Sequence, residues 1–393
     1  MISRPWLAIV LSVPLGFLGL LMVSEDAQGA EPGSPTLRAY VGAYTRGAGK
    51  GIYRFDFNPE TGAATPPVLA AESVDPSFLA FNPSEDLLYA VNEVSDPVPG
   101  KPNERTGWLT AYRVNKATGE LKELNRQPSG GAVACYVMID SQTRNALVAN
   151  YSGGSVSCIP LLADGSVGPQ VNTIRHGETP ELQKKARAHS IVLTPDERFA
   201  IAGDAGLDEL RIYRFDAAAG TLTPHEPHTV PTGPKSAARH VTFHPNGKWA
   251  YNNNEANFKI NSYDYDAATG QLTLRQTLST LDAETEQKGS TAEVLIHPSG
   301  KFAYVSNRGP DSIAIYHIDA DGQLTFQGTT STQGKTPRNF RIDPTGRFLL
   351  AANQGSSNIV FFRIDQQTGA LTPTGTVLEI PNPICIKFAH IPQ

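Results

Sequence analysis

One pattern of apolar and polar positions repeats along the chain. It is clearest in FHPNGKWAYNNNEANFKINSYDYDAATGQLTL from 243, IHPSGKFAYVSNRGPDSIAIYHIDADGQLTF from 296 and IDPTGRFLLAANQGSSNIVFFRIDQQTGALTP from 342. In each stretch an apolar run enters a Pro-x-Gly turn, and three further runs follow, separated by an Asn-containing loop and a Gly-containing turn. Alternation with period two, broken by Gly, Pro and Asn, predicts strands joined by tight turns. Each unit is therefore expected to form four antiparallel strands.

Weaker copies extend the repeat toward the N-terminus. They are FNPSEDLLYAVNE from 81, MIDSQTRNALVANY from 138 and LTPDERFAIAGDA from 193. The equivalent positions are Pro83, Ser141, Pro195, Pro245, Pro298 and Pro344. They recur about every 50 residues, which is the length of a β-propeller blade.

The two ends of the chain supply the remaining blade. Residues 37–45 match a second strand with no first strand before it, and residues 384–389 match a first strand with nothing after it. Joining them completes a seventh blade and leaves no exposed sheet edge. We therefore predict one all-β domain over residues 37–393, a seven-bladed β-propeller with four antiparallel strands per blade. Its ring is closed by N- and C-terminal strands that share a blade.

The N-terminus has the sequence features expected of an export signal. An uncharged apolar run over residues 6–23 follows Arg4, and the small residues Ala27 and Gly29 fit a cleavage site after Gly29. We predict a signal peptide at 1–29, a short linker at 30–36, and a folded part that is periplasmic or secreted. The run is long for a signal peptide, so an uncleaved anchor is the alternative, and membrane contact is expected only in that case.

Charge and cysteine content narrow the chemistry. The net charge is −5 and no basic block occurs, so composition does not point to nucleic acid. The three cysteines give no disulfide framework and no zinc-binding spacing. We expect a monomer that needs no metal and no other cofactor.

The repeat also predicts where a ligand would bind. The ends of the second strands and the starts of the first strands converge near the axis, on the face opposite the Pro-x-Gly turns. Equivalent positions of the seven blades form a column when the repeats are aligned. One column there, at the end of the second strand, is almost constant: Ala43, Asn92, Asn150, Asp204, Asn254, Asn307 and Asn353. Recurrent Asn predicts a structural role in holding loops.

The next column varies: Tyr44, Glu93, Tyr151, Ala205, Glu255, Arg308 and Gln354. Scaffold chemistry repeats from blade to blade, whereas a binding site needs different groups at different angles.

The variable positions predict a charged mouth to the central channel. The ionisable residues expected there are His189, Arg239, His240, Glu255, Glu293, Arg308 and Arg338. Insertions at 94–108, 175–188 and 281–291 extend loops on the same face, where loops on a rigid scaffold commonly build sites. The second insertion is basic, and is either a solvated loop or a lid that helps to hold an anion.

Several short motifs resemble one family. AHS at 188–190, ARH at 238–240, TAE at 291–293, SNRG at 306–309 and TPRNF at 336–340 are similar to those of seven-bladed propeller lactonases. This family includes bacterial 6-phosphogluconolactonases and carboxy-cis,cis-muconate lactonizing enzymes, and the resemblance spans about residues 37–389. It implies a catalytic set of His189, Arg239, Glu255 and Arg308. We add His240, Glu293, Arg338 and Asn307 as substrate-binding candidates. The sequence departs from the family at Arg187 and Tyr136, which stand where family members have histidines.

The resemblance implies a hydrolase that opens a sugar lactone without a metal ion. His189 would activate water as a general base, Glu255 would orient it or share this role, and the two arginines would stabilise the oxyanion. The expected partner is a small-molecule lactone or sugar acid. Export favours a free sugar lactone or another periplasmic lactone, because phosphogluconolactone arises in the cytosol. Two alternatives remain: a non-enzymatic propeller that binds a sugar acid or a protein partner, and a muconate-type lactonizing enzyme.

Overall fold

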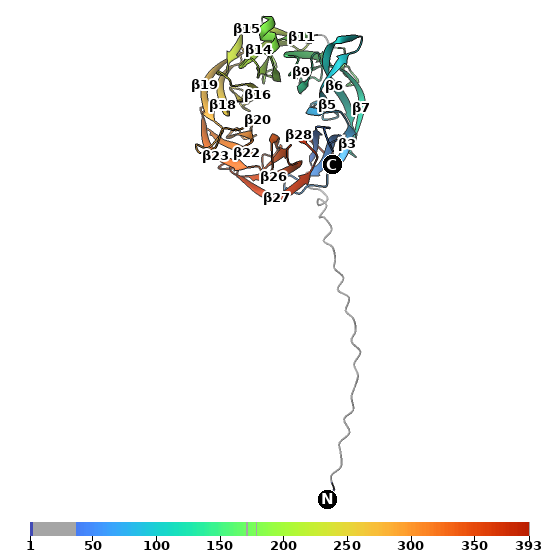
Figure 1. Cartoon of the computed structure of the whole chain (residues 1–393), viewed down its shortest axis with the longest axis vertical. Coiled ribbons are helices and arrows are strands. Elements are labelled where there is room, and N and C mark those ends of the chain that lie inside the picture. The colour runs from blue at the N-terminus through green and yellow to red at the C-terminus, as the bar shows by residue number, and fades with distance from the viewer. Residues whose placement is uncertain (3–36, 170–171, 178, 393) are drawn as a thin grey trace.

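Seven four-stranded antiparallel sheets surround a central channel in the computed structural model (Figure 1). The structure describes residues 1–2, 37–169, 172–177 and 179–392, so the predicted signal peptide beyond residue 2 and the predicted linker lie outside the described residues. No helix in the described ranges is long and apolar enough to cross a membrane.

Six blades are continuous in sequence. From the axis outward, the first blade has β4 (Pro76–Phe81), β5 (Leu87–Val98), β6 (Lys101–Val114) and β7 (Leu121–Pro128), and the second has β8 (Ala134–Ile139), β9 (Asn145–Asn150), β10 (Ser155–Pro160) and β11 (Asn172–Arg175). The third blade has β12 (Ala188–Leu193), β13 (Phe199–Asp204), β14 (Glu209–Asp216) and β15 (Thr221–Pro231), and the fourth has β16 (Ala238–Phe243), β17 (Trp249–Asn254), β18 (Lys259–Asp266) and β19 (Gln271–Ser279). The fifth blade has β20 (Ser290–Ile296), β21 (Phe302–Arg308), β22 (Ser312–Ile318) and β23 (Leu324–Ser331), and the sixth has β24 (Pro337–Ile342), β25 (Phe348–Asn353), β26 (Asn358–Ile364) and β27 (Leu371–Glu379).

The seventh blade joins the two ends of the folded chain, as predicted. Its order is β28 (Pro383–His390), β1 (Leu37–Ala43), β2 (Gly51–Phe57) and β3 (Val68–Glu72). β28 and β1 pair antiparallel from the Leu37–His390 pair to the Ala43–Pro383 pair. β28 also packs between β24 and β4, which closes the ring (Figure 1). The predicted seven-bladed propeller is therefore confirmed.

A recurrent tyrosine explains how neighbouring blades are joined. The second strands of four blades carry Tyr40, Tyr89, Tyr251 or Tyr304, each fully buried. Each hydroxyl donates a hydrogen bond to the carbonyl of a glycine in the next blade: Gly119 at 2.9 Å, Gly165 at 2.9 Å, Gly322 at 3.3 Å and Gly369 at 2.8 Å, respectively. All four glycines have positive φ, which favours glycine, so the Gly-containing turns of the repeat also serve the contact between blades.

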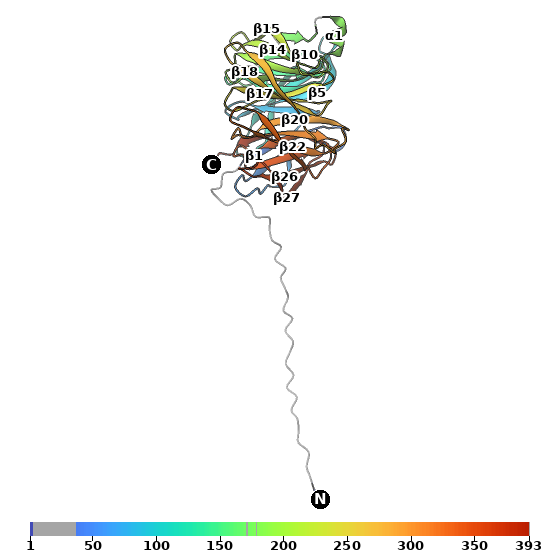
Figure 2. The same cartoon turned by 90° about the vertical axis from the view of Figure 1, so that its left-hand side faces the viewer.

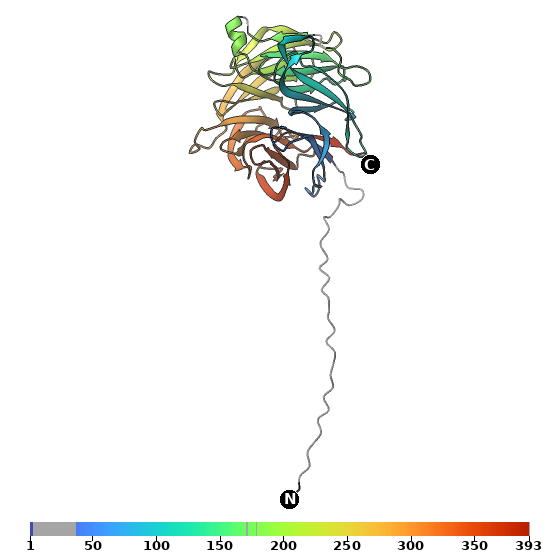
Figure 3. The same cartoon turned by 45° about the vertical axis from the view of Figure 1, so that its right-hand side comes forward.

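Two of the three insertions are more ordered than loops. Residues 94–108 mostly continue β5 and β6 as a paired hairpin, with Asp96 opposite Thr106. The insertion at 175–188 contains the short helix α1 (Pro180–Lys185), which lies at the edge of the ring (Figures 2 and 3). His176 anchors this segment: it is fully buried, with Nδ1 2.6 Å from Asp204 and Nε2 2.8 Å from the Tyr213 hydroxyl.

Candidate active site

The mouth of the channel, on the face opposite the Pro-x-Gly turns, brings together the four residues of the implied catalytic set. His189 lies near the start of β12, and Arg239 near the start of β16. Glu255 follows the end of β17, and Arg308 is the last residue of β21. These strands belong to three consecutive blades, so residues far apart in sequence meet at one place on the ring.

Glu255 bridges the two arginines. One carboxylate oxygen accepts a hydrogen bond from Nη2 of Arg308, and the other lies 3.8 Å from Nε of Arg239. Burial alone would raise the pKa of the Glu255 carboxyl, but the charges of Arg239 and Arg308 outweigh burial and lower that pKa. The Nε atoms of both arginines are buried and have no hydrogen-bond partner among the described residues. Each guanidinium therefore has one donor that no described protein group satisfies with a hydrogen bond.

His189 is neutral in this environment. Only 5% of the residue is exposed, and burial together with the nearby charge of Arg239 puts the pKa of its imidazole well below the ordinary value. Its ring lies 5.4 Å from that of Tyr151 and 5.3 Å from that of His240. Nδ1 of His189 has no hydrogen-bond partner within the described ranges. A neutral imidazole with a free nitrogen can accept a proton.

A chain of polar contacts supports Arg239 from below. Nη1 of Arg239 lies 3.2 Å from Nε2 of His240, and Nδ1 of His240 lies 2.8 Å from a Glu293 oxygen. Because a guanidinium can only donate, Nε2 must accept and the proton of neutral His240 sits on Nδ1, donated to Glu293. Burial lowers the pKa of His240 despite the opposing charge of Glu293. Both ring nitrogens of His240 are thus engaged in holding Arg239 in place.

Arg239 remains a cation near neutral pH. Burial lowers the pKa of its guanidinium to about 10, and Glu255 opposes that shift. Nη1 also donates to the backbone carbonyl of Ala292. Arg239 is therefore fixed by a carbonyl, an imidazole and a carboxylate, and it is still charged at pH 7.

Arg338 completes the charged mouth with two partners that the candidate set omitted. Nη2 of Arg338 lies 3.7 Å from Glu93, and the Tyr44 hydroxyl donates to the same Glu93 oxygen at 2.7 Å. The guanidinium of Arg338 stands 5.5 Å from the centre of the Tyr44 ring. Tyr44, Glu93 and Tyr151 all belong to the variable column. That column was the signal that could have added them to the set.

Asn307 is hydrogen-bonded to the connection between β19 and β20 and to β22 of its own blade. It is fully buried, its Nδ2 donates to Thr280 O at 2.8 Å, and its Oδ1 accepts from the Thr280 hydroxyl at 2.7 Å. Nδ2 also lies 3.2 Å from the Ser312 hydroxyl. Asn254 and Asn353 make comparable loop contacts through Thr232 and Thr332. The side-chain amide of Asn307 is thus occupied by loop hydrogen bonds, which is the arrangement expected of a structural residue in the constant column.

The two departures from the family motifs have different surroundings. Nη1 of Arg187 donates to the carbonyl oxygens of Lys184 and Ala186, so this side chain is engaged within its own insertion. Tyr136 stacks on Phe78 with ring centroids 4.1 Å apart, directly under His240 at 5.2 Å. Tyr136 therefore contributes to the floor of the mouth. In the part of the chain that is described, no three His, Cys, Asp or Glu side chains are grouped to hold a metal ion.

Fold and site together define a β-propeller with a histidine, arginine and glutamate cluster at the mouth of its channel. The family model "Lactonase, 7-bladed beta-propeller" matches residues 38–388, and the chain belongs to this family. It is 34% identical to the 6-phosphogluconolactonase of Bacillus subtilis over 354 residues, 89% of this chain and 98% of that protein. It is 33% identical to the 6-phosphogluconolactonase of Formosa agariphila over 314 residues, covering 77% and 86% of the two chains.

A solved structure gives the same picture. The periplasmic gluconolactonase of Pseudomonas aeruginosa superposes with a TM-score of 0.83 at 31% identity. The match covers 91% of this chain and all of that chain. The similarity thus extends over nearly the entire propeller.

Proposed function

We propose that this protein is an exported lactonase that hydrolyses sugar lactones. The observation that carries the proposal is neutral His189 beside the Glu255-bridged pair of Arg239 and Arg308, in a propeller of the lactonase family. The names of its relatives support this substrate class, since they include 6-phosphogluconolactonases and a periplasmic gluconolactonase. The apolar N-terminal run supports export.

The proposed reaction begins with His189 taking a proton from water as the oxygen attacks the lactone carbonyl carbon. The carbonyl oxygen becomes an oxyanion, which the free donors of Arg239 and Arg308 stabilise. The ring C–O bond then breaks, and the His189 imidazolium returns its proton to the departing ring oxygen, giving an open-chain hydroxy acid. Glu255 holds the two arginines and stays ionised, which makes it a positioning residue in this scheme.

The charge balance at the mouth favours an unphosphorylated lactone. Arg239 and Arg308 share Glu255, and Arg338 pairs with Glu93, so three cations face two carboxylates. The ionised Glu293 lies directly beneath. With Glu293 counted, three carboxylates balance the three cations, so no cation is left to neutralise a phosphate, whereas a neutral lactone adds no charge to the buried site before its oxyanion forms.

The proposal is tested with purified protein and two substrates. We expect kcat/KM for glucono-1,5-lactone to exceed that for its 6-phosphate by about tenfold or more, which corresponds to about 1.4 kcal/mol. Proton release, corrected for spontaneous hydrolysis, measures both. A preference for the phosphorylated lactone would overturn the argument from charge. Binding of gluconate without turnover of either lactone would favour the non-enzymatic alternative.

The pH profile tests the protonation state of His189. Because burial and Arg239 lower its pKa, the neutral base persists as the pH falls below the ordinary histidine range. We expect kcat/KM to stay level from pH 8 to below pH 6.5, and to fall at lower pH with uptake of one proton. This parameter reports the free enzyme. A decline centred at or above an ordinary histidine pKa of about 6.5 would contradict the assignment.

A further inference from the structure

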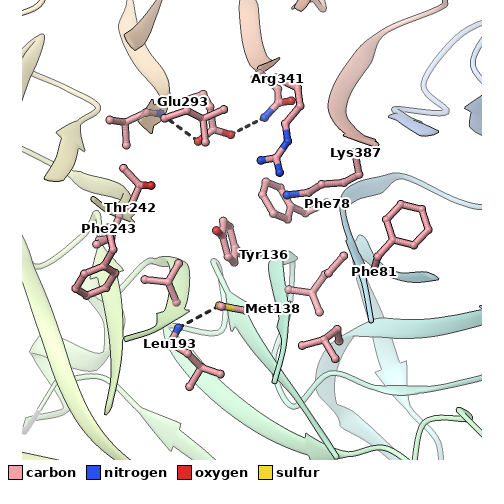
Figure 4. A pocket seen from close by; sticks show the side chains of 18 of the residues that line it. Phe78, Phe81, Tyr136, Met138, Leu193, Thr242, Phe243, Glu293, Arg341 and Lys387 are labelled. Atoms are coloured by element: carbon pink, nitrogen blue, oxygen red, sulfur yellow. Dashed lines mark hydrogen bonds between the residues drawn. The ribbon is translucent and has the colours of Figure 1, made fainter. Parts of the chain in front are cut away.

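A second chamber occupies the channel on the side opposite the mouth. It is a cavity of about 580 Å³, walled by the innermost strands and reaching the turn residues Pro195 and Glu197 (Figure 4). The volume lies within the range of small-molecule binding sites. The chamber opens among the Pro-x-Gly turns, whereas the His189 site lies at the other end of the channel.

A partition of side chains stands between the chamber and the mouth. Phe78 and Tyr136 stack at 4.1 Å, and the His240 ring meets them edge-on at 5.7 Å and 5.2 Å. Phe78 and Tyr136 line the chamber, while His240 supports Arg239 on the mouth side. A ligand in the chamber would therefore not occupy the lactone site.

Two cations point into the chamber, and the nearby Glu293 interacts with Lys387 only through space, without a direct ion pair. Figure 4 shows the side chains of Arg341 and Lys387 extending toward one another near Phe78. Among the described residues, neither side chain forms an ion pair or a hydrogen bond, and the ammonium of Lys387 rests 4.5 Å from the centre of the Phe78 ring. Burial, together with the charge of Arg341, lowers the pKa of Lys387 to about 8. Unpaired cations in a partly dry site are costly, and an anion between them would remove that cost.

The carboxylates of the chamber are already engaged. Glu293, at its inner end, accepts hydrogen bonds from His240 and Asn339. Glu197, at the opening, accepts hydrogen bonds from the backbone and hydroxyl of Ser141 at 2.8 Å each. Arg341 and Lys387 are thus left to bind an anion from solution.

The rest of the wall combines polar groups at Thr194, Thr242 and Asn339 with apolar side chains. The aromatic and aliphatic side chains include Phe81, Phe243, Phe388 and Met138. A hydroxyl-rich sugar would leave this aromatic surface uncovered, whereas an apolar ligand body would bury it. We propose that the chamber binds an organic anion with an apolar body, whose carboxylate, phosphate or sulfonate head lies between Arg341 and Lys387. This site is independent of the proposed lactonase activity.

The probe 8-anilinonaphthalene-1-sulfonate has the required chemistry, and its fluorescence rises in an apolar site. We expect the protein to bind one equivalent, and the double variant Lys387→Met, Arg341→Met to raise Kd at least tenfold, because charge-assisted hydrogen bonds are lost. The uncharged analogue N-phenyl-1-naphthylamine should bind both proteins equally. Since the replaced cations are unpaired, the double variant should keep its Tm.

Control variants separate the chamber from other cationic surfaces. Lys248→Met, Lys301→Met removes two exposed lysines from turns on the same face and should leave Kd unchanged. Arg308→Met removes a cation from the mouth and should also leave it unchanged. Equal affinity of wild type and the Lys387, Arg341 variant would overturn the proposal, as would a lack of saturable binding. Loss of binding in Arg308→Met alone would place the anion at the mouth and would overturn it too.

Discussion

Replacing His189 with alanine should lower kcat/KM for glucono-1,5-lactone by about 10²- to 10⁴-fold, the contribution of a positioned general base. The loss should fall mainly on kcat, because His189 takes up the water proton in the transition state. The ring is neutral, near Arg239, and has a free nitrogen. Initial rates of proton release at pH 7, over a range of lactone concentrations, measure kcat and KM separately.

The control for this variant is His297→Ala. His297 is also buried, at 2% exposure, but it lies beyond β20 at a Pro-x-Gly turn and its Nε2 bonds Gly346 O at 2.7 Å. Its loss should reduce stability and leave kcat/KM within about threefold. Added imidazole should restore part of the activity of His189→Ala, since the small ring can enter the space left behind. A folded His189→Ala protein with near-normal kcat would show that another group activates the water.

The fold could be predicted because each blade repeats the same physical solution. The alternation of apolar and polar residues predicted the strands, and the Pro-x-Gly turns marked the equivalent position in each blade. The unmatched apolar runs near Leu37 and Ile384 predicted that the two ends of the chain pair to complete the last blade. The pairing of β1 with β28 confirms that prediction. The 94–108 insertion was expected as a loop, and its residues mostly pair as a hairpin. Their polar composition hid this, because a ribbon that projects from the ring needs no apolar face.

Much of the candidate site could be located because scaffold and function occupy different columns. Asn307 belongs to the column that repeats, and Arg308 to the one that varies. In the structure Asn307 bonds the backbone of Thr280, between β19 and β20, whereas Arg308 bonds Glu255. Burial and pairing were not readable from the sequence. Glu93, for example, meets Arg338 across the terminal blade, a contact that only ring closure creates.

The chamber was missed for a geometric reason. Arg341 and Lys387 lie further along the innermost strands than the positions at the mouth. In the sequence they resemble ordinary charged residues within strands. Their common orientation toward the axis depends on register between β24 and β28, which are neighbours in space. Glu293 connects the two ends of the channel, because it lines the chamber and also accepts a hydrogen bond from His240 below the mouth.

Replacing Arg308 with methionine should reduce kcat by about 10²- to 10³-fold, the loss expected when one donor to an oxyanion is removed. Glu255 would keep Arg239 as a partner, so the carboxylate is not left unpaired and the fold should survive. The matched control is Arg46→Met, which removes an exposed arginine from its ion pair with the buried Asp75 on the same face and should leave kcat unchanged. Arg308→Lys should recover only part of the loss, because an ammonium cannot donate to Glu255 and the oxyanion in one planar fork.

The division between kcat and KM decides what Arg308 does. If it stabilises the oxyanion, kcat falls while KM changes little, since the charge develops only in the transition state. If it only grips the ground-state lactone, KM rises and kcat is preserved. Because Glu255 already partly neutralises Arg308, a neutral lactone has little to gain from it before the carbonyl oxygen becomes charged. We therefore expect the first outcome, and a pure KM effect would remove Arg308 from the catalytic step.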